Sequence, residues 1–215
     1  MFKNLKYDIE NVMKNDPAVR TKLEVLLLYQ SIHVLIFYRI AHGLYKIKLF
    51  FLARLISQLG RFFTGVEIHP GAKIGKGLFI DHGMGVVIGE TTVIGENCLL
   101  YQGVTLGGTG KDKGKRHPTL GNNVMVGAGA KVLGPITIGN NVKIAANAVV
   151  LQPIPDNCTA VGVPARIARR DGVKVEQDLD QVHYRDLNME DICALRKRLA
   201  DVQKEIDGIC RQRGD

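Results

Sequence analysis

Residues 120–150 read LGNNVMVGAGAKVLGPITIGNNVKIAANAVV, and an aliphatic side chain returns at every sixth position. Apart from two breaks the spacing begins further upstream, on Ile68, Ile74, Ile80, Ile88, Ile94, Leu100, Leu106, Leu120, Val126, Val132, Ile138, Ile144 and Val150. Most are followed four positions later by a second apolar or small residue: Ala72, Leu78, Met84, Thr92, Cys98, Val104, Val124, Ala130, Ile136, Val142, Ala148 and Ile154. A period of six fits neither an amphipathic helix nor a two-faced strand.

This hexapeptide repeat predicts a parallel β-helix, in which three short strands and three tight corners make one coil of about eighteen residues. The repeated aliphatic side chain lies inside, and the corners need small residues. The repeat is broken by two extra residues within 81–87 and by eight within 107–119. A coil contacts only its neighbours, so extra residues leave the stack as loops and are kept for reasons other than core burial. Both loops carry a histidine beside a charged residue, and we expect the functional site there.

The chain divides into a helical domain at 1–65, the β-helix at 66–170, and a charged linker with an amphipathic or coiled-coil helix at 171–215. In the first segment Asp16-Pro17 is expected to begin a helix, and Gly43 and Gly65 to end helices. The β-strand pattern is expected to close at 162–166, where glycine and proline occur. The last helix has a seam of Ile192, Leu195, Leu199, Val202, Ile206 and Ile209, which either pairs with other copies or packs on its own domain.

Composition limits the classes of partner. The chain has 215 residues, 46% of them hydrophobic, which is enough for one solenoid with appendages. A formal net charge of +8 indicates an anionic partner, either a phosphate-bearing cofactor or nucleic acid. Nucleic acid is the weaker interpretation, because tryptophan and RNA-binding aromatic signatures are absent. The four cysteines form no C-x-x-C pair, and neither a secretory signal nor a bilayer-spanning stretch is visible, so we expect a cytoplasmic protein without a membrane partner.

Glu67 and His82 form a candidate catalytic pair. They are fifteen positions apart, close to one coil, so the solenoid can bring them together. A carboxylate bonded to one imidazole nitrogen fixes the tautomer and leaves the other nitrogen to accept a proton, as a general base requires. From spacing alone, a loop histidine that contacts only solvent is the simpler interpretation.

Five motifs resemble those of bacterial and plant serine O-acetyltransferases. They are His69-Pro70-Gly71-Ala72-Lys73-Ile74-Gly75, Asp81-His82-Gly83-Met84-Gly85-Val86-Val87-Ile88-Gly89-Glu90-Thr91, Gly103-Val104-Thr105-Leu106-Gly107-Gly108-Thr109-Gly110, Arg116-His117-Pro118 and Gly162-Val163-Pro164-Ala165-Arg166. The hexads alone indicate only the wide class of hexapeptide acyltransferases. The Asp-His loop combined with Gly-Gly-Thr-Gly and Arg-His-Pro is much more specific, and the resemblance covers residues 10–170.

The resemblance implies a left-handed β-helix assembled as a trimer, with active sites between neighbouring subunits. It also implies that acetyl-CoA and L-serine give O-acetyl-L-serine and CoA, the first step of cysteine biosynthesis, without a metal. His82 is then the base that takes the hydroxyl proton and returns it to the leaving thiolate, and Glu67 orients His82. His117 lies beside the reacting end, where hydrogen-bond donors must hold the developing oxyanion.

The resemblance also assigns the binding residues. Asp16 and Asp81 are placed near the serine ammonium and Arg116 near the carboxylate, with Glu90 and His117 in the same site. Arginine offers a planar fork to a carboxylate, although without the resemblance Arg116 is simply one of several solvated basic residues in its loop. For acetyl-CoA, the expected contacts are Gly108, Thr109, Ala128, Ala146 and Arg166. Small residues let the pantetheine arm approach closely.

Three features depart from the family pattern. Glu67 stands where many relatives have aspartate, and because the carboxylate is kept we expect activity to be retained. The helical segment before Asp16 is shorter than the one that joins two trimers in long enterobacterial forms, so a trimer is expected and a hexamer stays open. The chain ends in Arg213-Gly214-Asp215 instead of the isoleucine that relatives insert into cysteine synthase, which argues against that complex. L-cysteine shares the ammonium and carboxylate of serine and is expected to be a feedback inhibitor.

Other functions compete with this one. A different hexapeptide O-acetyltransferase would act on a sugar or antibiotic hydroxyl, but the acidic residues and Arg116 form a clamp suited to a zwitterion. A trimeric zinc hydratase would need three imidazoles around a metal, whereas His69, His82 and His117 include no close pair in the sequence. A non-catalytic scaffold would have no need of the Asp-His and Arg-His-Pro loops.

Overall fold

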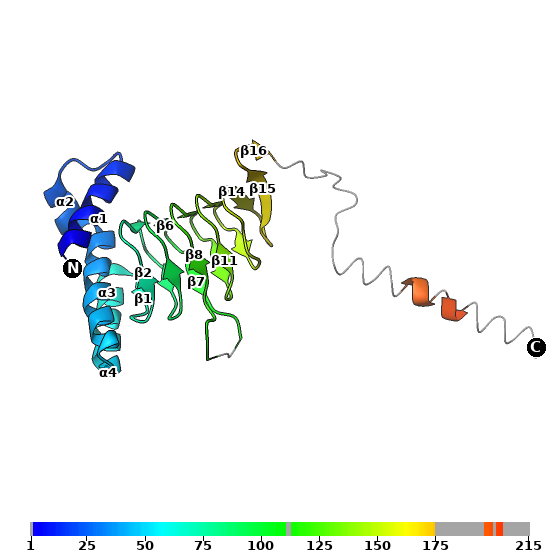
Figure 1. Cartoon of the computed structure of the whole chain (residues 1–215), viewed down its shortest axis with the longest axis horizontal. Coiled ribbons are helices and arrows are strands. Elements are labelled where there is room, and N and C mark those ends of the chain that lie inside the picture. Colours follow the sequence, from blue (N-terminus) through cyan, green and yellow to red (C-terminus); the bar gives the residue numbers. More distant parts are fainter. Residues whose placement is uncertain (1, 111–112, 175–195, 200, 204–215) are drawn as a thin grey trace, which may run out of the picture. The chain divides into compact units, whose positions relative to one another are not determined.

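The computed structural model describes residues 2–110, 113–174, 196–199 and 201–203. The chain forms two compact units, residues 1–175 and 176–215. The first unit begins with helices α1 (Phe2–Asn15), α2 (Lys22–Leu28), α3 (Gln30–Lys46) and α4 (Phe50–Thr64). In Figure 1 these helices stand at one end of a stack of β-coils.

Short parallel strands follow, three to a coil. They are β1 (Glu67–Ile68), β2 (Lys73–Ile74), β3 (Phe79–Asp81), β4 (Val87–Ile88), β5 (Val93–Ile94), β6 (Leu99–Tyr101), β7 (Thr105–Gly107), β8 (Thr119–Leu120), β9 (Met125–Val126), β10 (Lys131–Leu133), β11 (Thr137–Ile138), β12 (Lys143–Ile144) and β13 (Val149–Val150). Sheet A has the order β1-β4-β7-β10-β13, and sheet B the order β2-β5-β8-β11. Sheet C begins β3-β6-β9-β12.

The pairing within sheet A gives the length of each coil. Residues 67, 87, 105, 131 and 149 are successive partners, so the coils advance by 20, 18, 26 and 18 residues. Three hexads make the regular coil of 18, and the two longer coils hold the two and the eight extra residues found in the sequence. The predicted parallel β-helix with two loops is confirmed.

The hexad side chains form the core of the solenoid. All of them are buried except Ile74, which is half-buried. Met84 stands at the second apolar position of its hexad in the sequence, but its side chain is 63% exposed. The two extra residues shift the register, so that Val86 fills the interior position instead, fully buried.

Side chains of α3 and α4 complete the open edge of the first coil. Ser57 donates a hydrogen bond to the carbonyl of Ile68 and Tyr38 to the carbonyl of Ala72, each at 2.7 Å. The hydroxyl of Ser31 accepts from an amide of β3 at 3.0 Å. Buried backbone groups need such partners, so these contacts fix the helical cap on the coils.

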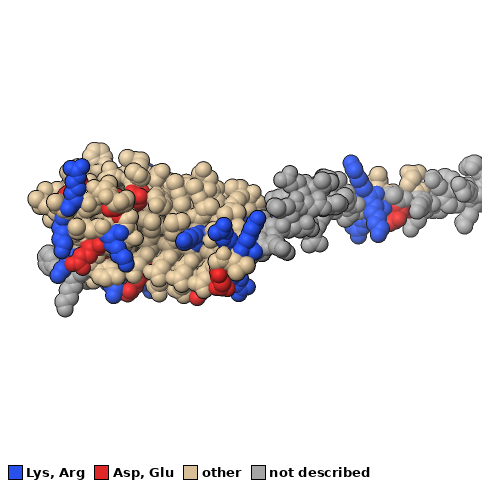
Figure 2. All heavy atoms as spheres, turned by 90° about the horizontal axis from the view of Figure 1, so that it is seen from above, with Lys and Arg blue, Asp and Glu red and all other residues tan. Residues whose placement is uncertain are grey.

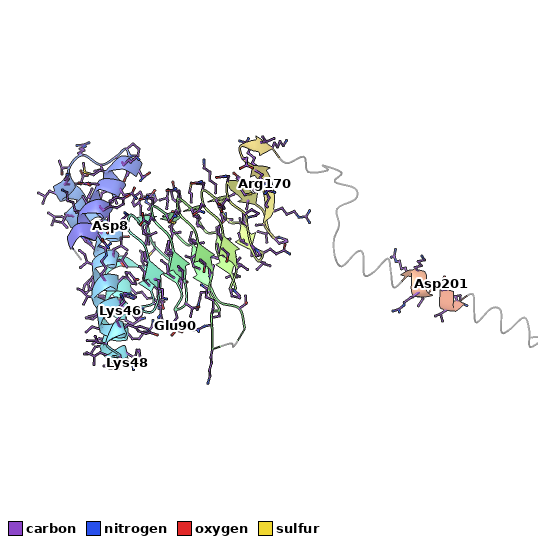
Figure 3. All side chains as sticks on the ribbon, in the orientation of Figure 1. Asp8, Lys46, Lys48, Glu90, Arg170 and Asp201 are labelled. Atoms are coloured by element: carbon purple, nitrogen blue, oxygen red, sulfur yellow. The ribbon has the colours of Figure 1, made fainter. Side chains whose placement is uncertain are left out.

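Helix α1 is anchored through a buried carboxylate. Asp8 is completely buried and forms an ion pair with Arg39 of α3, while its other oxygen accepts from the amide of Gly77 at 2.8 Å. Figure 3 labels Asp8 where α1 meets the first coils. Burial raises the pKa of Asp8 above its usual value, against the opposing effects of these hydrogen bonds.

Two expected helix boundaries are wrong. Asp16 does not begin a helix: α1 ends at the preceding residue, and Asp16 accepts from the amide of Ala18 at 2.8 Å in the following turn. Helix α2 is instead capped by Thr21, whose hydroxyl accepts from the amide of Glu24. Gly43 lies inside α3, because the helix-forming residues around it continue the helix. Gly65 ends α4 in the left-handed conformation, as predicted.

The last parallel strand ends at Val161, just before residues 162–166, where the β-strand pattern was expected to close. The chain reverses there, and β14 (Cys158–Val161), β15 (Arg166–Arg170) and β16 (Val173–Lys174) add antiparallel pairs to sheet C. In the second unit, residues 196–199 and 201–203 are helical and carry Leu199 and Val202 with exposed side chains. The remaining residues of the predicted seam lie outside the described residues.

Basic residues do not gather in one patch on the face seen in Figure 2. Lys and Arg atoms there fall in separate groups over the cap and near the far end of the coils, with acidic atoms beside both. Within the described ranges no single helix is long and apolar enough to cross a membrane, although α2 and α3, bent by 65°, pass that test as a pair.

Candidate active site

Most of the predicted site residues lie along the two long edges of sheet A. The corners that lead from sheet C into sheet A are residues 82–86, 102–104, 127–130 and 145–148, and we call this row the C–A edge. The corners that lead from sheet A into sheet B include residues 69–72, 89–92, 108–110 and 113–118, and we call this row the A–B edge. Both predicted loops lie on these rows, one on each.

On the C–A edge, Asp16, Asp81 and His82 line one pocket of about 390 Å³ together with Tyr29. Asp81 ends β3, and His82 follows it with a φ of 59°, which turns the imidazole outward. The His82 side chain is 75% exposed, and its Nε2 lies 4.0 Å from Asp81 Oδ1. The pocket thus combines two carboxylates with an accessible imidazole. A pocket of about 420 Å³ beside α1 holds none of the predicted site residues.

Tyr29 holds Asp16 in this pocket, which the sequence analysis did not foresee. Its hydroxyl donates to Asp16 Oδ2 at 2.6 Å. Burial and then this carboxylate raise the pKa of Tyr29 to about 12, so the phenol stays a donor at neutral pH. No motif marks Tyr29, because only the path of α2 and α3 brings it to Asp16.

Glu67 lies on β1, next to the corner that carries His82. Its amide donates to the carbonyl of Val86 at 2.9 Å. Its carboxylate forms ion pairs with Arg61 at 2.9 Å and Arg54 at 3.9 Å, both on α4. Among the contacts of the described residues Glu67 is engaged by these arginines and not by His82, so its orienting role stays a prediction.

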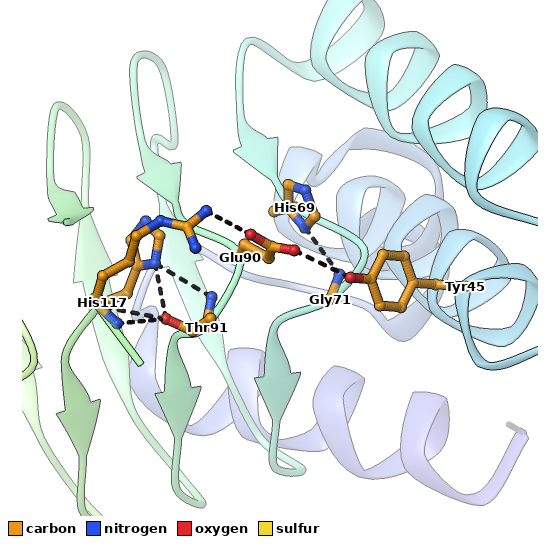
Figure 4. A network of polar contacts seen from close by, with 7 residues as sticks. Tyr45, His69, Gly71, Glu90, Thr91 and His117 are labelled. Carbon is orange, nitrogen blue, oxygen red and sulfur yellow. Dashed lines mark hydrogen bonds and ion pairs between the residues drawn. The ribbon is translucent and has the colours of Figure 1, made fainter. Parts of the chain in front are cut away.

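On the A–B edge, Arg116 and Glu90 form an ion pair that extends to the cap (Figure 4). Tyr45 of α3 donates to the other oxygen of Glu90 at 3.1 Å. The hydrogen bond from Arg116 is the main cause that lowers the pKa of Glu90. A guanidinium and a carboxylate of the predicted substrate site are therefore already paired within one chain, and Tyr45 joins them to α3.

His117 lies beside this pair and is 8% exposed. Its Nδ1 contacts the amide of Thr91 at 3.2 Å and the hydroxyl of Thr91 at 2.9 Å. Burial first, and then the neighbouring Arg116, lower the pKa of His117 below its usual value. The imidazole is therefore neutral at neutral pH.

The predicted acetyl-CoA contacts are divided between the two edges. Ala128 and Ala146 occupy equivalent corners of successive coils on the C–A edge, where the amide of Asn147 donates to the carbonyl of Ala128 at 2.8 Å. Gly108 and Thr109 lie on the A–B edge, at the start of the long loop. Small residues leave the backbone accessible at both rows. Arg166, the remaining predicted contact, is exposed at the start of β15.

Residues 117–152 match the family of bacterial transferase hexapeptide proteins (six repeats). The chain is 52% identical over 206 residues to the serine acetyltransferase of Bacillus subtilis, covering 96% of this chain and 95% of that protein. It is 64% identical over 168 residues to the serine acetyltransferase of Helicobacter pylori, covering 78% of this chain and 98% of that protein. The chain belongs to the serine acetyltransferase family. The family predicted from the five motifs is thereby confirmed.

Solved serine acetyltransferases have the same fold. The Neisseria gonorrhoeae serine acetyltransferase in complex with serine superposes with a TM-score of 0.76 at 41% identity, over 78% of this chain and 69% of that chain. The Brucella abortus serine acetyltransferase in complex with coenzyme A gives 0.77 at 43% identity, over 79% and 68%. A serine acetyltransferase in complex with cysteine gives 0.76 at 46% identity, over 78% and 69%. The fold is the predicted left-handed β-helix.

Among the described residues of this serine acetyltransferase family member, no group of three His, Cys, Asp or Glu side chains is placed to hold a metal ion. The sequence analysis missed Thr91, although it stands inside a quoted motif directly after Glu90. Its contacts with the long loop depend on two successive coils lying side by side.

Proposed function

We propose that this chain transfers the acetyl group of acetyl-CoA to the hydroxyl of L-serine, giving O-acetyl-L-serine and CoA. The observation that carries the proposal is the pocket in which the exposed His82 lies beside Asp16 and Asp81. Opposed carboxylates suit the ammonium of an amino acid and disfavour a neutral sugar. Family membership supports the same reaction, and relatives have been solved with serine and with coenzyme A.

In this mechanism His82 is the general base. Its free ring nitrogen takes the serine hydroxyl proton as the oxygen attacks the thioester carbon. The tetrahedral intermediate collapses with cleavage of the carbon–sulfur bond, and the imidazolium returns the proton to the thiolate of CoA. Glu67 stabilises the imidazolium, and Arg116 binds the serine carboxylate through its planar fork.

The active site is built between subunits of a trimer. His82 lies on the C–A edge and Arg116 and His117 on the A–B edge, so one serine contacts all three when the C–A edge of one subunit faces the A–B edge of the next. The division of the predicted acetyl-CoA contacts supports the same arrangement: Ala128 and Ala146 face Gly108 and Thr109 across the interface, and Arg166 meets a phosphate.

The proposed reaction leads to a proposed inhibitor and a proposed cellular location. L-cysteine carries the ammonium and carboxylate of serine, so it competes for the same site as a feedback inhibitor, and a relative has been solved with cysteine. Free thiols at Cys98 and Cys158 fit a reducing compartment, and we place the reaction in the cytoplasm as the first step from serine to cysteine. A trimer suffices for this function.

The test is an acceptor panel. Purified protein is incubated with acetyl-CoA and L-serine, D-serine, L-threonine or a hexose, and CoA release is followed together with the mass of the product. We expect L-serine to be the preferred acceptor and O-acetyl-L-serine the product. Preference for the hexose would overturn the proposal.

A further inference from the structure

Thr91 makes an unusually complete set of contacts with the long loop. Its hydroxyl accepts hydrogen bonds from the amides of Arg116 at 3.0 Å and His117 at 3.1 Å. Its carbonyl accepts from Lys115 Nζ at 2.7 Å. Its amide and its hydroxyl both contact His117 Nδ1. One residue of the second coil thus holds three consecutive residues of the third, as Figure 4 shows for His117.

These contacts determine where the protons lie. A backbone amide can only donate, so Nδ1 of His117 must accept from the amide of Thr91 and carries no proton. The hydroxyl of Thr91 uses both lone pairs on the two loop amides, which leaves its single hydrogen for Nδ1. With Nδ1 as an acceptor, a neutral ring must carry its proton on Nε2.

The surroundings of Nε2 leave that proton available. Gly89 and Gly108 flank the ring: a Cβ on Gly89 would overlap it, and one on Gly108 would lie 3.3 Å from Nε2. In the part of the chain that the structure describes, hydrogen bonds of the His117 ring are made through Nδ1 alone. Charged groups near the ring are Arg116, Lys115 and Glu90, and the two cations disfavour a second proton.

We propose that Thr91 is a positioning residue that fixes His117 as its Nε2–H tautomer, so that His117 acts as a hydrogen-bond donor to a substrate oxygen and not as a second base. This inference rests on the proposed function for the identity of that oxygen. The acceptor is either the serine carboxylate or the thioester oxygen as it gains charge. Thr91 itself does not contact the substrate.

The first test is spectroscopic and observes the wild-type protein directly. Long-range ¹H–¹⁵N NMR of the histidine-labelled protein without substrate, assigned with His117→Asn, reports the protonation of both ring nitrogens. We expect a protonated Nε2 and an unprotonated Nδ1 on His117. A protonated Nδ1 overturns the proposal. Failure to acetylate serine would overturn the proposed function. The spectrum would still test whether His117 is held as its Nε2–H tautomer, because it does not depend on activity.

The second test uses a matched pair of neighbouring threonines. Thr91→Val keeps the volume and removes the hydroxyl, and we expect turnover to fall about 10-fold or more, as for other residues that orient a site histidine. Thr91→Ser restores the hydroxyl and most of the rate. Thr92→Val is the control, because the buried hydroxyl of Thr92 has no partner among the described residues, and its rate stays at the wild-type level.

The kinetic constants then identify the acceptor. A rise in KM for serine in Thr91→Val indicates the carboxylate, and a fall in kcat at unchanged KM indicates the thioester oxygen. Both results support the donor role. Wild-type kinetics and a wild-type tautomer in Thr91→Val would show that Thr91 does not position His117.

Discussion

His82 and Glu90 lie at the two ends of one short strand: His82 is in the corner that enters β4, and Glu90 in the corner that leaves it. The base therefore belongs to one edge of sheet A, and the Glu90–Arg116 pair to the other. In a coiled solenoid these edges face different directions, so we propose that the two half-sites of one chain act on two different serine molecules. Each complete site would then be shared by two subunits.

Removal of the base should separate catalysis from folding. His82 is mostly exposed and lies in a loop, so His82→Ala leaves the melting temperature close to the wild-type value. Turnover falls by about 10²–10⁴-fold, the usual contribution of a general base. CoA release measures the turnover, and a thermal melt of the same sample measures the melting temperature. Near-normal turnover would refute the role of His82.

Among the polar residues of the cap, Asp8 should contribute most to the free energy of unfolding. Asp8→Ala leaves the charge of Arg39 without its partner, and we expect a loss of about 3–5 kcal/mol in the free energy of unfolding. Glu10→Ala on the same helix is the control, since Glu10 and Lys22 are exposed and such pairs contribute about 0–1 kcal/mol. Urea titration of both variants makes the comparison. Equal losses would show that the buried pair does not anchor α1.

Alanine substitutions at two glycines should change the free energy of unfolding in opposite directions. Gly43 lies inside α3 with open space around a built Cβ, so Gly43→Ala raises the free energy of unfolding by about 0.5–1 kcal/mol. Gly75 lies against the next coil, where a Cβ would be 2.6 Å from the carbonyl oxygen of Gly95. Gly75→Ala therefore destabilises the stack. Differential scanning calorimetry of the two variants checks the signs, and a stabilised Gly75→Ala would contradict the close approach of the coils.

Two histidines with lowered pKa values should make the free energy of unfolding fall in acid. Burial is the first cause that lowers the pKa of both His69 and His117 in the folded state. As the pH falls through about 6.5, the unfolded chain binds protons first, so the stabilisation present above that pH is lost below it. Urea titrations between pH 7.5 and about 5 should show a smaller decline in His69→Asn than in the wild type. An identical decline would exclude a contribution from His69.

Much of the solenoid could be predicted because its signal is local. The hexad fixes which side chains face inward, and the coil lengths recover the two insertions in the sequence. Met84 could not be placed, because a two-residue insertion shifts the phase and only packing decides that Val86 is interior. The predicted helix end at Gly43 was wrong because a glycine with helix-forming neighbours need not end a helix.

The candidate site was predictable only as a set of residues. The family resemblance indicated Asp16, Asp81 and His82, and the structure brings these three together in one pocket. No motif marked Tyr29, and Thr91 stood in a motif without a predicted role, because both residues act through contacts made between coils or between helices. Short sequence motifs identify the reactive side chains. The residues that orient these side chains are distant in the sequence and are brought close only by the stacking of the coils and helices.

Complementation between two inactive variants tests the shared site most directly. His82→Ala and Arg116→Ala are each purified alone as controls. The two variants are also co-expressed with different affinity tags, and the mixed assembly is isolated through both tags. In a cyclic trimer each mixed assembly has both wild-type edges at one of its three interfaces, so the protein isolated through both tags should show about a third of the wild-type rate per subunit. We predict that the mixed protein regains this activity while each variant alone stays nearly inactive. A mixed protein no more active than its separate components would place His82 and Arg116 in the same single-chain site and contradict the account.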